Sequence, residues 1–87
     1  MWHLYVLHSI KSGRSYIGIA EDQFSRLEKH NSGSVRSTKG YRPWELIHVE
    51  EYNTKREARL RELELKRSGY KREQLFKKIE RALSSIG

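Results

Sequence analysis

The stretch from Tyr16 to His30, YIGIAEDQFSRLEKH, constrains the fold most, because it reads as a short strand that runs directly into a helix. Asp22 is a favourable N-cap for that helix. Arg26 and His30 are four residues apart, so they lie one above the other on the same helix face. Local geometry therefore brings a phenol, a guanidinium and an imidazole close together. Such groups are suited to holding a phosphate and moving a proton beside it.

Around this stretch, apolar alternation, turn residues and helix signals predict the order β-β-α-β-α-α. Eighty-seven residues suffice for one small domain with a thin core, so we expect a single domain over residues 1–87. The expected strands are Trp2–Ser9, Ser15–Ile19 and Trp44–Tyr52, and the expected helices run from Asp22 to Gly33, from Thr54 to a break at Ser68–Tyr70, and from Lys71 to Ser84.

The first two strands are expected to form a hairpin around Ser12 and Gly13. In that register Ser9 lies opposite Tyr16, and the two-residue period of a strand places Tyr5 on the same face as Tyr16. Apolar residues on both sides of the first strand indicate that both of its faces are buried.

The amphipathic helices predict which residues turn inward. Phe24 and Leu27 give the first helix its inward face, with Arg26 and His30 at the margin of that face. The last helix carries a basic outer face. Its core positions are Leu75, Ile79, Ala82 and Leu83.

The tryptophans and three of the histidines are also assigned to structure. Trp2 and Trp44 are expected to be core or core-edge residues rather than base-stacking platforms. His3, His8 and His48 lie on predicted strands.

Glu62 is the main anomaly of the pattern, because it falls within an otherwise apolar helix stripe formed by Ala58, Leu65 and Gly69. An inward-facing carboxylate is costly unless it is paired or binds a cation. The pattern favours neither a buried ion pair with an arginine nor a metal ion over the other.

The charge of the chain indicates an anionic partner. There are 18 Lys and Arg residues against 11 Asp and Glu residues, a formal charge of +7, and nucleic acid is the first candidate. The loop from Gly33 to Pro43 lacks an apolar period and is expected to contact phosphates through Arg36, Lys39 and Arg42.

Several classes of protein are excluded or disfavoured. The absence of cysteine rules out a disulfide scaffold and a cysteine-based zinc site. No apolar run approaches the roughly 20 residues that a membrane span requires, and the N-terminus does not resemble a signal peptide. We therefore expect a cytoplasmic protein without membrane contact.

The chain resembles the GIY-YIG nuclease domain, in particular its small stand-alone bacterial members. The first motif is present as His3-Leu4-Tyr5, with His3 where the family name has Gly, and the second is Tyr16-Ile17-Gly18. Further matching segments are Arg26 with His30, His30–Gly33, Thr38–Gly40, Arg42–Trp44, and the helix positions Ala58, Glu62 and Lys66.

The resemblance implies a three-stranded antiparallel sheet flanked by three helices, an α+β fold. It also implies that Glu62 is the metal ligand, with Glu64 as the alternative if the helix register differs, because Arg59 follows Ala58 where the family usually has an apolar residue. The cofactor would be Mg²⁺ or Mn²⁺, with no small-molecule cofactor, and Lys66 joins the loop residues as a nucleic-acid contact.

Two hypotheses follow for the function. The first is a metal-dependent endonuclease that hydrolyses nucleic acid, DNA in preference to RNA, with catalytic residues Tyr5, Tyr16, Arg26, His30 and Glu62. Tyr5 is favoured over Tyr16 as the base that takes a proton from the attacking water, and a protein partner could supply specificity. The alternative is a basic nucleic-acid-binding module without turnover. A purely structural domain is least favoured, since it leaves Glu62 and Arg26 without a reason.

Overall fold

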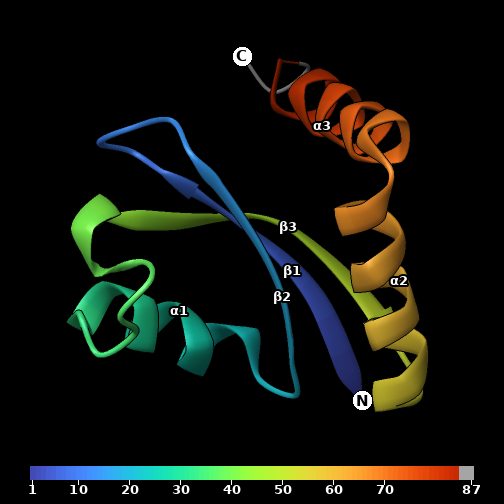
Figure 1. The fold of residues 1–87 in the computed structure, drawn as a ribbon, viewed down its shortest axis with the longest axis horizontal. Helices are drawn as coiled ribbons and strands as arrows, with labels where there is room; N and C mark the ends of the chain where they lie inside the picture. The colour runs from blue at the N-terminus through green and yellow to red at the C-terminus, as the bar shows by residue number, and fades with distance from the viewer. Residues whose placement is uncertain (85–87) are drawn as a thin grey trace.

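Three strands form one antiparallel sheet in which β1 (Trp2–Ser9) lies between β2 (Ser15–Ala20) and β3 (Trp44–Tyr52) (Figure 1). The structure is a computed structural model that describes residues 1–84. Its order β-β-α-β-α-α and its antiparallel sheet confirm the predicted α+β fold. The helical elements are α1 (Gln23–Ser32), the short 3₁₀ turn η1 (Lys39–Tyr41), α2 (Lys55–Arg67) and α3 (Gly69–Ser84).

Both faces of β1 are buried, as predicted. Leu4 and Val6 belong to a cluster with Leu65 of α2 and with residues of α3, whereas Tyr5 and Leu7 face the opposite side. Helices α2 and α3 therefore cover one face of the sheet, and α1 with its following loop covers the other (Figure 1). This division matters below, because candidate site residues come from both faces.

The predicted hairpin register is wrong by two residues. Tyr16 pairs with Leu7 rather than with Ser9, and Tyr5 pairs with Gly18. The loop is longer than expected, because the Ser9 amide bonds to the Arg14 carbonyl at 2.8 Å and closes the hairpin there. A shift of two preserves the face of every side chain, so Tyr5 and Tyr16 still lie on one face.

Helix α1 begins and ends where the sequence predicts. The Asp22 side chain accepts from the amides of Phe24 and Ser25, and Gly33 ends the helix at φ +84°. The predicted inward face is wrong at Phe24, which is 63% exposed, whereas His30 is fully buried. Because Leu27 and His30 face the sheet, Phe24 lies about 120° away from His30 around the helix and points outward.

Helices α2 and α3 meet at Ser68, so the predicted break is shorter than Ser68–Tyr70 and α3 starts at Gly69. Gly69 is exposed and does not extend the buried stripe of α2. Leu75 and Ile79 are buried as predicted. Ala82 and Leu83 are exposed, contrary to prediction, because the last turn of α3 lies beyond the apolar cluster.

The loop between α1 and β3 is ordered by Trp44 rather than simply solvated. The Trp44 indole, 4% exposed, donates to the carbonyl of Thr38 at 3.0 Å. The Asn31 side chain bonds to the Trp44 backbone amide and carbonyl. Thr38 is thereby held in the interior, at 2% exposure. Trp44 is a core residue, as predicted, and Trp2 is half-buried.

Among residues 1–84, no helix combines the length and apolar character needed to cross a membrane.

Candidate functional site

Tyr5, Tyr16 and His30 form a ring cluster between α1 and the sheet. The ring centroids of Tyr16 and His30 are 4.6 Å apart, and Tyr5 lies 6.2 Å from Tyr16 and 6.1 Å from His30. Gly18 makes room for this cluster, because a Cβ there would lie 2.6 Å from the Tyr5 hydroxyl and 2.7 Å from Cζ. The glycine of the Tyr16-Ile17-Gly18 motif is therefore explained by the phenol that lies across it.

A buried chain of hydrogen bonds connects this cluster to the loop. The Tyr5 hydroxyl lies 3.2 Å from Nε2 of His30, and Nδ1 of His30 lies 2.8 Å from Oγ1 of Thr38. The Thr38 hydroxyl donates to the Val35 carbonyl, so it accepts from Nδ1–H of His30. Nε2 then carries the lone pair and accepts from Tyr5. Thr38 thus sets the tautomer in which His30 can receive a proton from the phenol.

Burial keeps the hydrogen-bonded side chains of Tyr5 and His30 uncharged. It lowers the pKa of His30, and the Arg26 guanidinium acts in the same direction. It raises the pKa of Tyr5, although the neighbouring Arg26 opposes that shift. At neutral pH the proton therefore resides on the phenol and the imidazole is neutral. Tyr5 is 0% exposed and Tyr16 is half-buried, so Tyr16 is the more accessible phenol.

Arg26 adds a cation with an unmet hydrogen-bonding requirement. Within residues 1–84, its Nε is a buried side-chain nitrogen without a hydrogen-bond partner. Leaving a buried donor unpaired costs about 1–3 kcal/mol, and more when it is charged. An anion that binds beside Arg26, such as a phosphate, would supply the missing acceptor.

Glu62 is buried as predicted, and here it forms an ion pair. Its carboxylate bonds to Arg59 through Oε1 and to Lys66 through Oε2, the latter at 2.9 Å. Burial raises the pKa of Glu62, but the hydrogen bonds from Lys66 and Arg59 more than offset it, so the pKa is lowered. Of the two alternatives left open by the sequence, the buried ion pair is present. Glu64 is more exposed and pairs with Arg61 and Lys71.

The two halves of the candidate site lie on opposite sides of the edge strand β2. Tyr5, Tyr16 and His30 belong to the α1 face, whereas Glu62 comes from α2, which packs on the other face (Figure 1). A metal ion held by Glu62 would have to reach the phosphate on Arg26 around this edge. In the part of the chain that the structure describes, Glu62 forms no hydrogen bond or ion pair with Arg26.

The donor set fits only a metal that needs few protein ligands. No group of three or more His, Cys, Asp or Glu side chains that could hold an ion occurs within residues 1–84. Magnesium can bind through one carboxylate, with water and phosphate oxygens completing its shell. Lys66 and Arg59 would have to release Glu62, and both side chains are about half exposed, at 49% and 54%.

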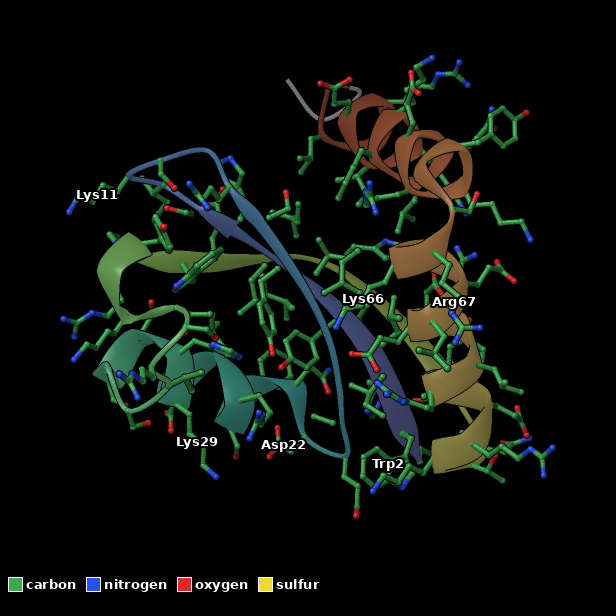
Figure 2. All side chains as sticks on the ribbon, viewed as in Figure 1. Trp2, Lys11, Asp22, Lys29, Lys66 and Arg67 are labelled. Atoms are coloured by element: carbon green, nitrogen blue, oxygen red, sulfur yellow. The ribbon has the colours of Figure 1, made fainter. Side chains whose placement is uncertain are left out.

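The predicted nucleic-acid contacts fall in two places. Arg36, Lys39 and Arg42 are exposed in the loop after α1. Lys39 and Arg42 line a groove of about 480 Å³ together with Lys11, which lies in the loop between β1 and β2. Lys66 lies apart from them and extends from α2 toward the strands (Figure 2). The loop groove and Lys66 thus offer two separate cationic contacts.

Sequence reasoning missed Thr38 as a partner of His30, because nothing in its spacing signals burial. The buried ion pair of Glu62 with an arginine was one of the two predicted alternatives. The prediction did not identify its cations, although Arg59 and Lys66 stand at the i−3 and i+4 positions typical of helix ion pairs. The remaining histidines pair with carboxylates near the sheet, in line with a structural role: His3 with Glu51, His8 with Glu45 and His48 with Glu50.

The fold and this set of side chains define the class of the protein. A family model described as the GIY-YIG catalytic domain matches residues 1–82, and the chain belongs to this family, as its motifs predicted. The family is one of nucleases, which generally use divalent metals.

The chain is similar to small UPF0213 proteins. One from Staphylococcus epidermidis is 40% identical over 79 residues, covering 90% of this chain and 94% of the relative. Another, from Staphylococcus aureus strain N315, is 42% identical over 65 residues, covering 74% and 79%. The solution NMR structure of the UPF0213 protein BH0048 from Bacillus halodurans has 35% identity and a TM-score of 0.54, covering 88% of this chain and 84% of that one.

Proposed function

We propose that the protein is a metal-dependent endonuclease that hydrolyses phosphodiester bonds of nucleic acid, DNA in preference to RNA. The observation that carries the proposal is the buried, unpartnered Nε of Arg26 beside a hydrogen-bonded phenol–imidazole pair. A phosphate satisfies that donor, and Arg26 then offsets the charge that builds on its oxygens in the transition state.

In this mechanism the phenols and the imidazole manage the proton of the attacking water. Tyr16 is half-buried and can reach solvent, whereas Tyr5 lies behind it and bonds to His30. Because the Tyr5 hydroxyl bonds to Nε2 of His30, Tyr5 can give its own proton to that nitrogen as the phenols take up the proton of the attacking water, and Thr38 holds the tautomer that this transfer requires. This assignment moves the water-facing role from Tyr5, which the sequence favoured, to Tyr16.

Glu62 is the residue that would hold Mg²⁺ or Mn²⁺, once Lys66 and Arg59 have released it. When bound, the ion supplies Lewis-acid polarisation of the phosphate and stabilises the leaving oxygen. Phosphates of the incoming strand compete for Lys66, and the loop cations Arg36, Lys39 and Arg42 hold the backbone on the side of the loop after α1.

A cleavage panel tests the proposal. Plasmid, branched and single-stranded DNA and single-stranded RNA are incubated with Mg²⁺ or Mn²⁺, beside Arg26→Ala and Glu62→Ala. We expect metal-dependent cleavage by the parent and a loss of at least ~100-fold in each variant. Circular dichroism checks that the variants fold. Equal cleavage by Glu62→Ala and the parent in magnesium would refute the metal role.

The second candidate, a nucleic-acid-binding module without turnover, is favoured by one observation. Both carboxylate oxygens of Glu62 are already occupied by side-chain cations. This candidate predicts salt-sensitive binding that Glu62→Ala leaves unchanged or strengthens, with no product after long incubation with metal.

A further inference from the structure

A groove of about 460 Å³ adjoins Arg26 on the side away from the loop cations. It lies where β2 ends and α1 begins, and the residues that matter for its chemistry are Trp2, Ile19, Ala20, Glu21, Arg26 and Lys55. Figure 2 shows Trp2 and Asp22 at the same edge of the molecule, near the N-terminal end of β1. Because Arg26 belongs to both, the groove is contiguous with the phosphate position proposed above.

Trp2 differs from Trp44 in ways that suit a ligand. Trp44 is 4% exposed and its indole nitrogen donates to Thr38. Trp2 is half-buried, and within residues 1–84 its indole nitrogen has no hydrogen bond. The Lys55 ammonium lies 5.2 Å from the centre of the Trp2 ring, and Lys55 is exposed. A planar ligand can displace this exposed cation and take its place over the ring.

The charges of the groove favour a base over a phosphate. Arg26 and Lys55 are offset by two carboxylates, those of Glu21 and Asp22. Asp22 is occupied by the backbone amides that it caps. Glu21 has no ion pair within the described residues, so its carboxylate can accept from a base N–H group. A carboxylate repels phosphate but matches the edge of a nucleobase.

We infer that this groove is a nucleobase subsite, in which the nucleotide next to the phosphate on Arg26 stacks its base on Trp2. The inference rests on the proposed function and names its substrate class: nucleic acid with an unpaired nucleotide at that position. A base within a duplex is stacked on its neighbours and cannot reach a protein side chain without leaving the stack. The volume lies in the range of small-ligand pockets.

The two tryptophans make the experiment simple, because Trp2→Leu leaves Trp44 as the sole tryptophan. A single-stranded DNA heptanucleotide and a blunt duplex are titrated without metal, and tryptophan fluorescence and the anisotropy of labelled DNA are recorded. We expect the single strand to quench the parent and not Trp2→Leu. We expect its affinity to fall about 5- to 150-fold in Trp2→Leu, with duplex affinity unchanged.

Two further variants separate stacking from other effects. Trp2→Phe keeps an aromatic face and should restore most of the single-strand affinity. Tyr70→Leu removes an aromatic residue that is 72% exposed on α3 and lies outside this groove, so it should leave affinity and quenching unchanged. Thermal unfolding establishes that Trp2→Leu folds. If it does not, Trp2→Phe gives the readout, because it should bind the single strand without quenching, since only Trp44 remains as a tryptophan.

The outcomes distinguish this inference from the proposed function. Equal single-strand affinity of Trp2→Leu and the parent, or quenching that survives in Trp2→Leu, overturns the subsite. Quenching and the affinity loss without any cleavage uphold the subsite and refute the hydrolase. If the parent cleaves DNA and Trp2→Leu keeps the parent's preference for single-stranded over duplex DNA, the subsite is refuted and the proposed hydrolase is not.

Discussion

The α1 side and the α2 side of the candidate site are built in different ways. On the α1 side, Tyr5, His30 and Thr38 are all at most 2% exposed, and each is hydrogen-bonded to the next. On the α2 side, Glu62 is buried, but its two partners are long, half-exposed side chains. The hydrogen bonds on the α1 side are fixed by the packing around them. The ion pairs of Glu62 can be replaced by other contacts with little change in packing.

The difference indicates a division of labour. Groups that must hold one tautomer or one orientation are held by the interior of the fold, where relaxation is limited. In the proposed mechanism, the carboxylate of Glu62 would accept a metal ion, and it is neutralised here by cations on half-exposed side chains. Each charge-assisted hydrogen bond to Glu62 is worth about 1.5–3 kcal/mol, and a divalent ion can offset its loss because the half-exposed Lys66 and Arg59 regain water when they leave.

The largest effect is expected from removing one hydroxyl on the α1 side. Tyr5→Phe and Tyr16→Phe both keep the ring and its packing. Because proton transfer by a positioned group contributes about 10²- to 10⁴-fold, at least one variant should lose cleavage by that factor. Single-turnover rates at saturating metal measure it. Full activity in both variants would remove the phenols from the mechanism.

The next effect lies on the α2 side. Lys66→Met removes a competing cation from Glu62 while keeping the length of the side chain. A hydrogen bond between charged groups is worth about 1.5–3 kcal/mol, so we expect Mn²⁺ to bind about tenfold or more tightly. Calorimetric titration with Mn²⁺ measures this, and Lys78→Met, on α3, is the matched control. Unchanged Mn²⁺ affinity in Lys66→Met would show that this ion pair does not restrain the carboxylate.

A smaller effect is expected in the stability of the α1 side. Thr38→Val leaves Nδ1 of His30 without an acceptor and should lower the free energy of unfolding by about 1–3 kcal/mol. Thr38→Ser keeps the hydroxyl and should lose less. Urea unfolding compares the two. If Val and Ser destabilise equally, the hydroxyl does not hold the imidazole.

The smallest expected effect is that of acid on the free energy of unfolding. The α1 side and the α2 side should lose stability in separate pH ranges. The pKa of His30 is lowered by burial, so its contribution is complete above the ordinary value of about 6.5 and is lost as the pH falls toward the lowered value. The pKa of Glu62 is also lowered, so its contribution is lost only as the pH falls below about 4.3.

Unfolding of the parent, His30→Gln and Glu62→Gln from pH 7.5 to 3 measures these ranges. His30→Gln should flatten the upper range, by at most ~1.4 kcal/mol per pH unit, and Glu62→Gln the lower range. A His30→Gln curve parallel to that of the parent between pH 6.5 and 5 would contradict the buried, neutral imidazole.

The sequence predicts what depends on short-range periodicity. Tyr5 and Tyr16 share a face although the register is wrong, because a two-residue shift changes partners and not sides. Asp22 and Gly33 end α1 as predicted, since caps depend on local hydrogen bonds and on φ. Glu62 is buried because it belongs to the apolar stripe of its helix.

Features that depend on how the helices and loops pack on the sheet cannot be predicted from short-range periodicity. The rotation of α1 that exposes Phe24 and buries His30 is set by the rings beneath the helix. Thr38 is buried only because Trp44 holds its carbonyl. The partners of Glu62 lie at standard helix spacings and were readable, whereas its place across β2 from the phenols was not.

Gly18 leaves no room for a side chain between β2 and the Tyr5 ring. The space of one missing methyl group in an edge strand is filled by the tip of a ring from the neighbouring strand, and the imidazole lies directly behind that ring. At Gly13 and Gly40 an added carbon would meet open space. A Cβ at Gly18 would therefore wedge α1 away from the sheet, whereas a Cβ at Gly40 would meet nothing. At Gly13 the space is open, but the backbone φ of +77° would strain any residue with a Cβ.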